Sequence, residues 1–209
     1  GIQVFPGFQP SNEVDEDRDV ISAYLDVELD VTEDFLISGA LRWDDYSDFG
    51  DTVNIKGAMR YIVSDFVTIR GAVSTGFRAP SMQQQFFNNV STQFDSNGIP
   101  QSVGTFRNDS ALAKAVGIPE LEEEESFNVS LGVAFEPTEN LSITLDYYNI
   151  DIDDRIIISG RLTGDLGNAA LTQALTDAQV SRAQFFLNAA DTRTEGFDVV
   201  ATYNMEVFN

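Results

Sequence analysis

The alternation of apolar and polar residues is the feature that most constrains how this chain can fold. In the segment VISAYLDVELDV, residues 20–31, every second residue is apolar. The positions between them are mostly polar and include Asp26, Glu28 and Asp30. Because successive side chains of a β-strand point to opposite faces, this segment is predicted to be a strand with one apolar and one charged face.

Six further segments repeat this pattern. They cover residues 35–43, 52–63, 66–77, 126–137, 140–148 and 195–205. Each predicted strand has about ten residues, whereas strands of soluble proteins commonly have about five or six. Aromatic residues stand near the ends of the apolar faces at Phe35, Trp43, Phe127 and Phe135. The fold class predicted from these segments is all-β.

The connections between the predicted strands differ in length. Short turns are expected at residues 30–35, 62–66 and 136–141, and longer connections elsewhere, including DDYSDFGD at 44–51. In an antiparallel up-and-down meander, this order puts every short turn at one end and every long loop at the other. Long alternating strands with that asymmetry are typical of a transmembrane β-barrel, with the apolar face toward lipid and the polar face toward a watery interior.

The two longest connections are predicted to contain short helices. The segment DSALAKAVGIP offers Asp109 or Ser110 as the N-cap and Gly117 as the stop. Residues 168–186 also have a helical pattern, in one or two pieces.

Two other architectures also fit alternating strands. A passive porin-type barrel has the same wall. A soluble β-rich binding or adhesion module would instead bury its apolar residues, among them Ile21, Leu25, Ile37, Val129 and Leu145. The length of the strands and the sorting of the loops favour the membrane barrel.

Composition excludes several kinds of chemistry. The 209 residues include 34 acidic and 12 basic side chains, and neither cysteine nor histidine. Disulfides, thiolate metal sites and imidazole catalysis are therefore impossible. A net charge of −22 argues against a nucleic-acid partner. No catalytic constellation is evident, so we predict no enzyme activity, cofactor or metal. Residues 1–20 have no basic start and no apolar core, so no signal peptide is predicted.

Three stretches resemble TonB-dependent outer-membrane receptors. In that family an alternating strand ends in Gly-Phe-Arg-Ala-Pro-Ser, as residues 76–81 do here. Pro80 cannot donate to a strand ladder, so pairing is expected to end at this point. The segments LEEEESFNVSLGVAFEPTENLSITLDYYNIDIDDRI, residues 121–156, and NAADTRTEGFDVVATY, residues 188–203, are similar to further strands of the same family.

The resemblance implies that residues 1–209 are part of a receptor barrel in the cell outer membrane. Such receptors take up a scarce large solute: siderophore-bound iron, cobalamin, an oligosaccharide or a peptide. The implied partners are outer-membrane lipid, the receptor's own plug domain and TonB, and the solute. Family barrels have about 22 strands around a plug. No plug and no TonB-contacting box is recognised in this sequence, so we expect a portion of the wall.

The segment after the signature supplies the candidate ligand contacts. Amide groups and aromatic faces suit sugars or peptides, although a helical start of a loop packed on its neighbours is the simpler interpretation. The candidates are Arg78, Gln83, Gln84, Gln85, Phe86 and Phe87. On the polar faces of the strands, Arg42, Lys56, Arg60 and Arg70 are expected to line the interior.

Several acidic runs could bind cations but are interpreted as exposed. Residues 122–125 are expected to be a solvated start of a strand. The acids of DDYSDFGD and of DIDDR, residues 151–155, are expected in exposed loops, because neither run has the spacing of an EF-hand. DSNG, residues 95–98, is expected to form a turn.

Overall fold

A computed structural model describes residues 10–164 and 168–205. The chain divides into two units, which we name the sheet unit and the loop unit. The sheet unit comprises Asp19–Arg78, Glu125–Asp153 and the segment from Asp191 onward. The loop unit comprises the segment up to Arg18, Ala79–Glu124 and Asp154–Ala190. Each unit is described by itself.

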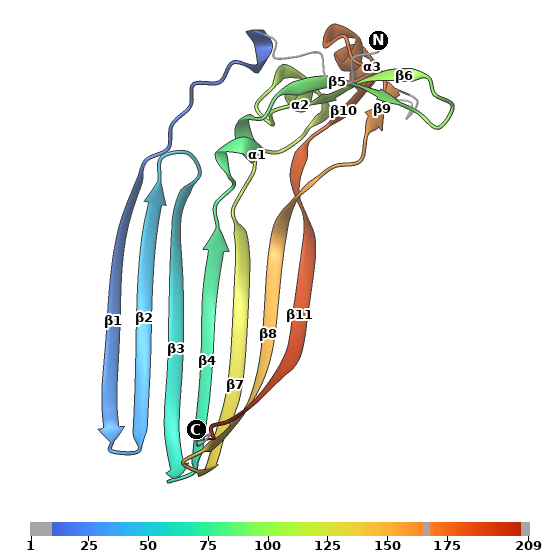
Figure 1. Cartoon of the computed structure of the whole chain (residues 1–209). Coiled ribbons are helices and arrows are strands. Elements are labelled where there is room, and N and C mark those ends of the chain that lie inside the picture. The colour runs from blue at the N-terminus through green and yellow to red at the C-terminus, as the bar shows by residue number, and fades with distance from the viewer. Residues whose placement is uncertain (1–9, 165–167, 206–209) are drawn as a thin grey trace. The chain divides into compact units, whose positions relative to one another are not determined.

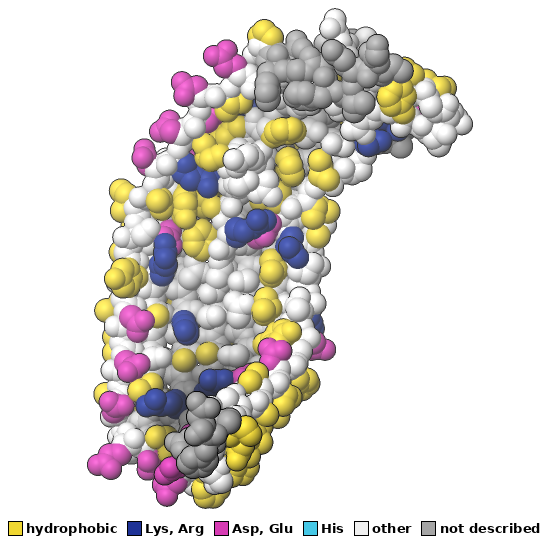
Figure 2. All heavy atoms as spheres, in the orientation of Figure 1, with side chains coloured by type: hydrophobic (Ala, Val, Ile, Leu, Met, Phe, Trp, Pro, Cys, Tyr) yellow, Lys and Arg dark blue, Asp and Glu magenta, His cyan; other side chains and the backbone are white. Residues whose placement is uncertain are grey.

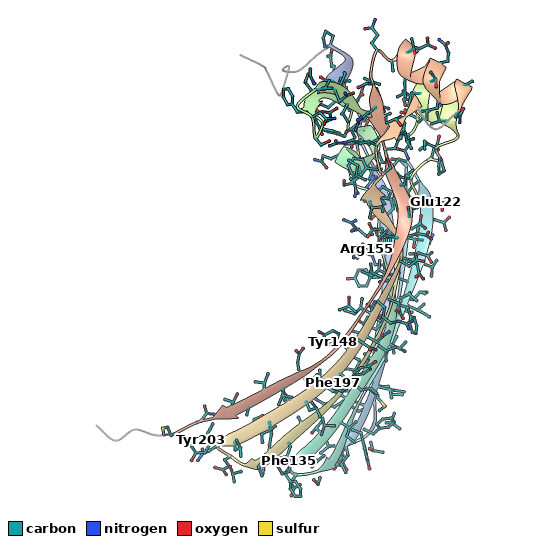
Figure 3. All side chains as sticks on the ribbon, turned by 90° about the vertical axis from the view of Figure 1, so that its right-hand side faces the viewer. Glu122, Phe135, Tyr148, Arg155, Phe197 and Tyr203 are labelled. Carbon is teal, nitrogen blue, oxygen red and sulfur yellow. The ribbon has the colours of Figure 1, made fainter. Side chains whose placement is uncertain are left out.

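Seven strands lie side by side in the order β1-β2-β3-β4-β7-β8-β11, forming a meander (Figure 1). Their bounds are β1 Val20–Thr32, β2 Phe35–Tyr46, β3 Gly50–Ser64, β4 Val67–Arg78, β7 Glu124–Thr138, β8 Leu141–Ile158 and β11 Phe186–Tyr203. All seven predicted strands are confirmed. With 12 to 18 residues, they are longer than predicted. The strands bend, so the sheet forms a curved wall (Figure 3).

The short turns lie where the sequence predicts them, at residues 33–34, 65–66 and 139–140. The predicted longer connection at 44–51 is wrong, because β2 continues to Tyr46 and β3 already begins at Gly50. Only residues 47–49 connect the two strands. Gly50 has a φ of 111°, which is accessible to glycine and lets the chain reverse within so few residues.

The register of the strands joins their apolar residues into rows. Leu25 pairs with Leu41, and Leu41 pairs with Ile55. Because paired residues share a face, the rows form one continuous apolar surface. The described chain leaves this surface uncovered: the exposed fractions are 62% for Leu25, 56% for Ile55, 44% for Val73 and 53% for Leu131.

The burial expected of a soluble module is therefore not found. Ile21, Leu25, Ile37 and Leu145 are exposed, and Val129 is half-buried.

Aromatic residues mark one end of the apolar surface. Phe35 packs edge-to-face against Tyr61, with ring centroids 5.9 Å apart, and Phe66 packs against Phe135 in the same way at 6.1 Å. Trp43 lies on the same strand, β2, about 26 Å from Phe35, since each residue of a strand adds about 3.3 Å. That length fits the apolar band of outer-membrane barrels, which is about 25 Å tall.

The other end of this surface is sharply defined on β8 and β11. Tyr147 packs against Phe197 with ring centroids 5.1 Å apart. Beyond Tyr147, the next residues on the same face of β8 are Asn149 and Asp151. Arg193 of β11 donates from Nε to Asp151 Oδ1 at 2.5 Å. Between Tyr147 and Asp151, this face of β8 thus changes from apolar to ionic.

The loop unit contains a second sheet that the sequence did not predict, with strand order β5-β6-β10-β9. The strands are β5 Asn89–Phe94, β6 Pro100–Thr105, β10 Arg182–Gln184 and β9 Leu162–Thr163, and the helices are η1 Pro10–Asn12, α1 Met82–Phe86, α2 Ala111–Val116 and α3 Ala169–Asp177. Among the described residues no helix has the length and apolar character needed to span a membrane.

A small hydrophobic core holds the loop unit together. Its buried residues are Leu112, Ala113, Leu171, Ala174, Leu175, Val180, Ala183 and Phe185. The predicted helix in DSALAKAVGIP is confirmed as α2, with Ser110 as N-cap and Gly117 as C-cap at a φ of 75°. The helical prediction for 168–186 is correct only for α3. Its second half forms β10 instead, because alternation there buries Ala183 against β6.

Candidate functional site

The segment after the Gly-Phe-Arg-Ala-Pro-Ser signature forms a short, well-capped helix. Ser81 Oγ accepts a hydrogen bond from the Gln84 N–H at 3.1 Å, and the Ser81 N–H donates to Gln84 Oε1 at 2.9 Å. This reciprocal arrangement is a capping box, which fixes the start of α1. The side chain of Gln84 therefore has a structural use in the helix.

A pocket of about 290 Å³ lies beside α1, and we name it the α1 pocket. Its lining residues are Asn12, Val14, Glu16, Met82, Gln83, Phe86, Phe87, Asn88 and Asn89. Three of the predicted ligand contacts, Gln83, Phe86 and Phe87, thus line one cavity.

Residues from the segment 12–16 complete the pocket, although no sequence pattern predicts a role for them there. Asn12 Nδ2 donates to the Asn88 carbonyl oxygen at 2.5 Å, and Arg18 Nη2 donates to the Pro80 carbonyl oxygen at 2.7 Å. These bonds hold the N-terminal segment against residues 80–89. Such long-range contacts leave no periodic signal in the sequence.

An arginine network stands behind the pocket wall. Arg107 Nη2 donates to Glu16 Oε1 at 3.1 Å and to Asp109 Oδ2 at 2.8 Å, and its guanidinium lies 4.8 Å from the centre of the Phe86 ring. The hydrogen bond to Asp109 raises the pKa of Arg107 above its ordinary value. The hydrogen bond to Glu16 and the contact with the Phe86 ring hold these two side chains in place.

The remaining predicted contacts lie elsewhere. Gln85 belongs to α1 but does not line the pocket. Arg78 is the last residue of β4 and belongs to the sheet unit. Contact between a solute and any of the six candidates stays a prediction.

Asp44 corrects the prediction that the acids of DDYSDFGD lie in an exposed loop. Its side chain is fully buried within β2. Ser22 Oγ donates to Asp44 Oδ1 at 2.5 Å, and Arg42 makes a two-pronged ion pair with both of its oxygens. Burial of a carboxylate is tolerated because each oxygen has a hydrogen-bond donor.

Two other acidic runs are also structural. Within 122–125, Glu122 and Glu125 are exposed as expected. Glu124 is instead buried and accepts from the Ile156 N–H at 2.8 Å, so the expectation of a solvated side chain is wrong for this residue. In the DIDDR run, Asp151 and its neighbours lie within β8 rather than in a loop.

The DSNG turn is confirmed. Asp95 Oδ1 accepts from the N–H groups of Asn97 and Ile99, each at 2.9 Å, and Gly98 has a φ of 76°. Over the residues described, no group of three or more acidic side chains is arranged to hold a metal ion.

The polar face of the sheet carries an ion pair that spans three strands. Arg70 of β4 donates to both oxygens of Asp146 of β8 at 2.7 Å. Gly132 of β7 lies between them, and a Cβ there would come within 2.1 Å of Asp146 Oδ1. The ion pair between Arg70 and Asp146 therefore requires glycine at position 132, where a side chain would occupy the space between them. Figure 2 shows basic side chains spread down the middle of the sheet and acidic ones along its β1 edge.

The family follows from comparison with known proteins. The family model described as TonB dependent receptor-like, beta-barrel matches residues 1–209. The chain belongs to the TonB-dependent receptor family. The probable TonB-dependent siderophore receptor PirA of Acinetobacter baumannii is 26% identical over 159 residues, covering 76% of this chain and 20% of that protein. The ferric enterobactin receptor PirA of Pseudomonas aeruginosa is 23% identical over 149 residues, covering 71% and 19%.

A solved receptor has the same fold. The crystal structure of the siderophore receptor PirA from Pseudomonas aeruginosa matches with a TM-score of 0.66 at 18% identity, covering 87% of this chain and 30% of that one. The chain spans about a fifth of the length of the curated TonB-dependent receptors it matches.

Membership of the TonB-dependent receptor family confirms the predicted fold, a portion of an outer-membrane β-barrel. The family consists of transport receptors rather than enzymes. It does not favour the passive porin or the soluble module.

Proposed function

We propose that these residues form part of the wall and part of the external loops of a receptor that imports a ferric siderophore across the outer membrane. The observation that carries this proposal is the continuous apolar surface of the sheet unit. Its exposed, in-register rows require hydrocarbon as a solvent, because apolar area of this size costs free energy in water. On the opposite face, the ion pair of Arg70 and Asp146 suits a wet interior.

Ferric siderophore is the solute that the relatives favour. The two curated relatives are named as a siderophore receptor and a ferric enterobactin receptor. Cobalamin, an oligosaccharide or a peptide would need the same wall and different loop contacts.

Energy coupling is proposed to come from partners outside these residues. In the proposed receptor, a plug domain fills the barrel and TonB moves the plug. We assign neither role to any of the 209 residues, which on this proposal are a partial barrel domain throughout.

The test is uptake of radioactive iron by the full-length receptor in a Gram-negative host lacking its own siderophore receptors. Cells are supplied with ferric enterobactin or with ferrichrome, and a matched strain lacks TonB. We expect uptake from at least one chelate in the presence of TonB and none without it. Uptake that persists without TonB indicates a passive pore, and a folded receptor that imports neither chelate refutes the proposed solute class.

A further inference from the structure

We infer that the α1 pocket binds an uncharged ferric chelate in preference to a polyanionic one. This inference rests on the proposed function and narrows its substrate class. Iron(III) held by three hydroxamates carries no net charge, whereas iron(III) held by three catecholates is a trianion. The two classes therefore make opposite demands on the charge of a binding site.

The walls of the pocket suit an uncharged chelate. Val14, Met82, Phe86 and Phe87 supply apolar and aromatic surface on which the methylene groups of a hydroxamate can pack. At about 290 Å³ the pocket lies just below the range for small-molecule sites, about 300–1,000 Å³. It would hold one side of a chelate rather than enclose it.

Two carboxamides at the pocket are available to the ligand. The side chains of Gln83 and Asn89 line the cavity and make no hydrogen bond within the described part of the chain. A carboxamide offers two N–H donors and a carbonyl acceptor. The donors match the carbonyl and N–O oxygens that a hydroxamate presents around its iron.

The charge of the pocket opposes a trianion. Among the described residues that line the pocket, Glu16 is the one charged side chain. Arg107, the cation beside it, already pairs with Glu16 and Asp109 and is not among the lining residues. Recognition of a multiply charged anion normally uses several convergent basic groups, and the part of the wall that the structure describes presents none.

The experiment measures the affinity of the purified full-length receptor in detergent for ferrichrome, an uncharged tris-hydroxamate, and for ferric enterobactin. We expect ferrichrome to bind at least about tenfold more tightly. Phe87→Ala should weaken ferrichrome binding about tenfold, because it removes an exposed aromatic wall of the pocket. Phe94→Ala is the matched control: Phe94 is an exposed phenylalanine of the same unit outside the pocket and should have no effect.

A charge reversal sharpens the test. Glu16→Lys should raise the affinity for ferric enterobactin several-fold, because it replaces the acidic side chain of the pocket wall with a cation. Retained mobility of the unheated variants on SDS gels shows that they fold. Tighter binding of ferric enterobactin to the unmodified receptor, or equal effects of Phe87→Ala and Phe94→Ala, overturns the inference. TonB-dependent import of ferric enterobactin alone would also overturn it while the proposed function stands, whereas import of neither chelate refutes the proposed function itself.

Discussion

The two units treat the same type of side chain in opposite ways. Phe185 is 0% exposed in the core of the loop unit, whereas Phe197, further along the same stretch of chain, is 70% exposed on the sheet. In the loop unit, helices α2 and α3 pack around their apolar residues and remove them from water. In the sheet unit, strand pairing satisfies the backbone but leaves the apolar rows uncovered. The loop unit is thus built for water and the sheet unit for hydrocarbon.

This difference shows which solvent stabilises each unit. The core of the loop unit gains free energy from burial within the chain itself. The sheet gains nothing comparable until lipid covers it, because its described strands leave their apolar rows uncovered and are joined by backbone bonds, aromatic pairs and ion pairs. The effect of a substitution on stability should therefore depend on the unit in which it lies and, in the sheet unit, on the face of the sheet.

The largest expected effect is loss of the core phenylalanine. Phe185→Ala in the full-length receptor should destabilise the loop unit by about 3–5 kcal/mol, because it removes a fully buried ring and leaves a cavity. Hydrogen exchange of α2 and α3 is the measurement, and protection there should fall sharply. Phe197→Ala, the same change on the exposed apolar face, should leave that protection unchanged. Equal loss in both variants would show that the loop unit has no independent core.

Introducing an arginine on one face of the sheet or on the other should distinguish the lipid-facing face from the polar face. Leu131→Arg should destabilise the receptor in lipid vesicles by about 2–4 kcal/mol, because arginine then lies in the apolar band. Ser130→Arg places the same charge on the neighbouring residue of β7, which points to the polar face, and should cost much less. Urea titration followed by gel mobility of the folded barrel compares them. Similar costs for both would contradict the assignment of the apolar face to lipid.

The cap of α2 has a smaller, local effect. Ser110 Oγ accepts from the Ala113 N–H at 3.2 Å. Ser110→Ala should reduce the stability of the loop unit by about 1 kcal/mol, since one N–H of the first helical turn loses its partner. Hydrogen exchange of α2 should show it. Ser110→Asp, which can also cap, should restore protection, and a failure to do so would mean that the loss has another cause.

The secondary structure of the sheet unit could be predicted from the sequence more completely than that of the loop unit, because its sequence pattern is repeated and its strands pair with their neighbours. The seven long strands follow from alternation, because the pattern repeats over many residues and each strand pairs with its neighbour in the meander. In the loop unit, α2 was predictable from Ser110 and Gly117, which act locally. The small sheet was not, because β6 pairs with β10 across almost eighty residues and both are short.

In the candidate site, too, residues of one local segment were predicted and residues placed by long-range contacts were missed. Gln83, Phe86 and Phe87 were predicted from the composition of one segment, and they do line one pocket. Glu16 and Val14 were missed, since their place in the wall depends on contacts with a segment far along the chain. Asp44 was taken for an exposed loop acid because the predicted strand ended at Trp43, whereas β2 continues to Tyr46 and Asp44 pairs with Arg42 of β2 and Ser22 of β1.

The smallest expected effect concerns the ion pair on the polar face of the sheet. Gly132→Ala would put a Cβ within 2.1 Å of Asp146 Oδ1 and 2.7 Å of Arg70 Nε. These atoms are the ends of flexible side chains, so the pair should separate while the strands keep their register. The cost should be about 0.5–1 kcal/mol, because both partners are partly exposed.

Two comparisons isolate that cost by urea titration in lipid. Gly39→Ala is the control, since a Cβ there meets nothing closer than 3.9 Å and should be tolerated. Arg70→Met should remove most of the effect of Gly132→Ala, because the pair is then already broken. If Gly132→Ala costs as much with Met at position 70 as with Arg, the glycine is needed for the close approach of the strands themselves, and the wet face owes nothing measurable to this ion pair.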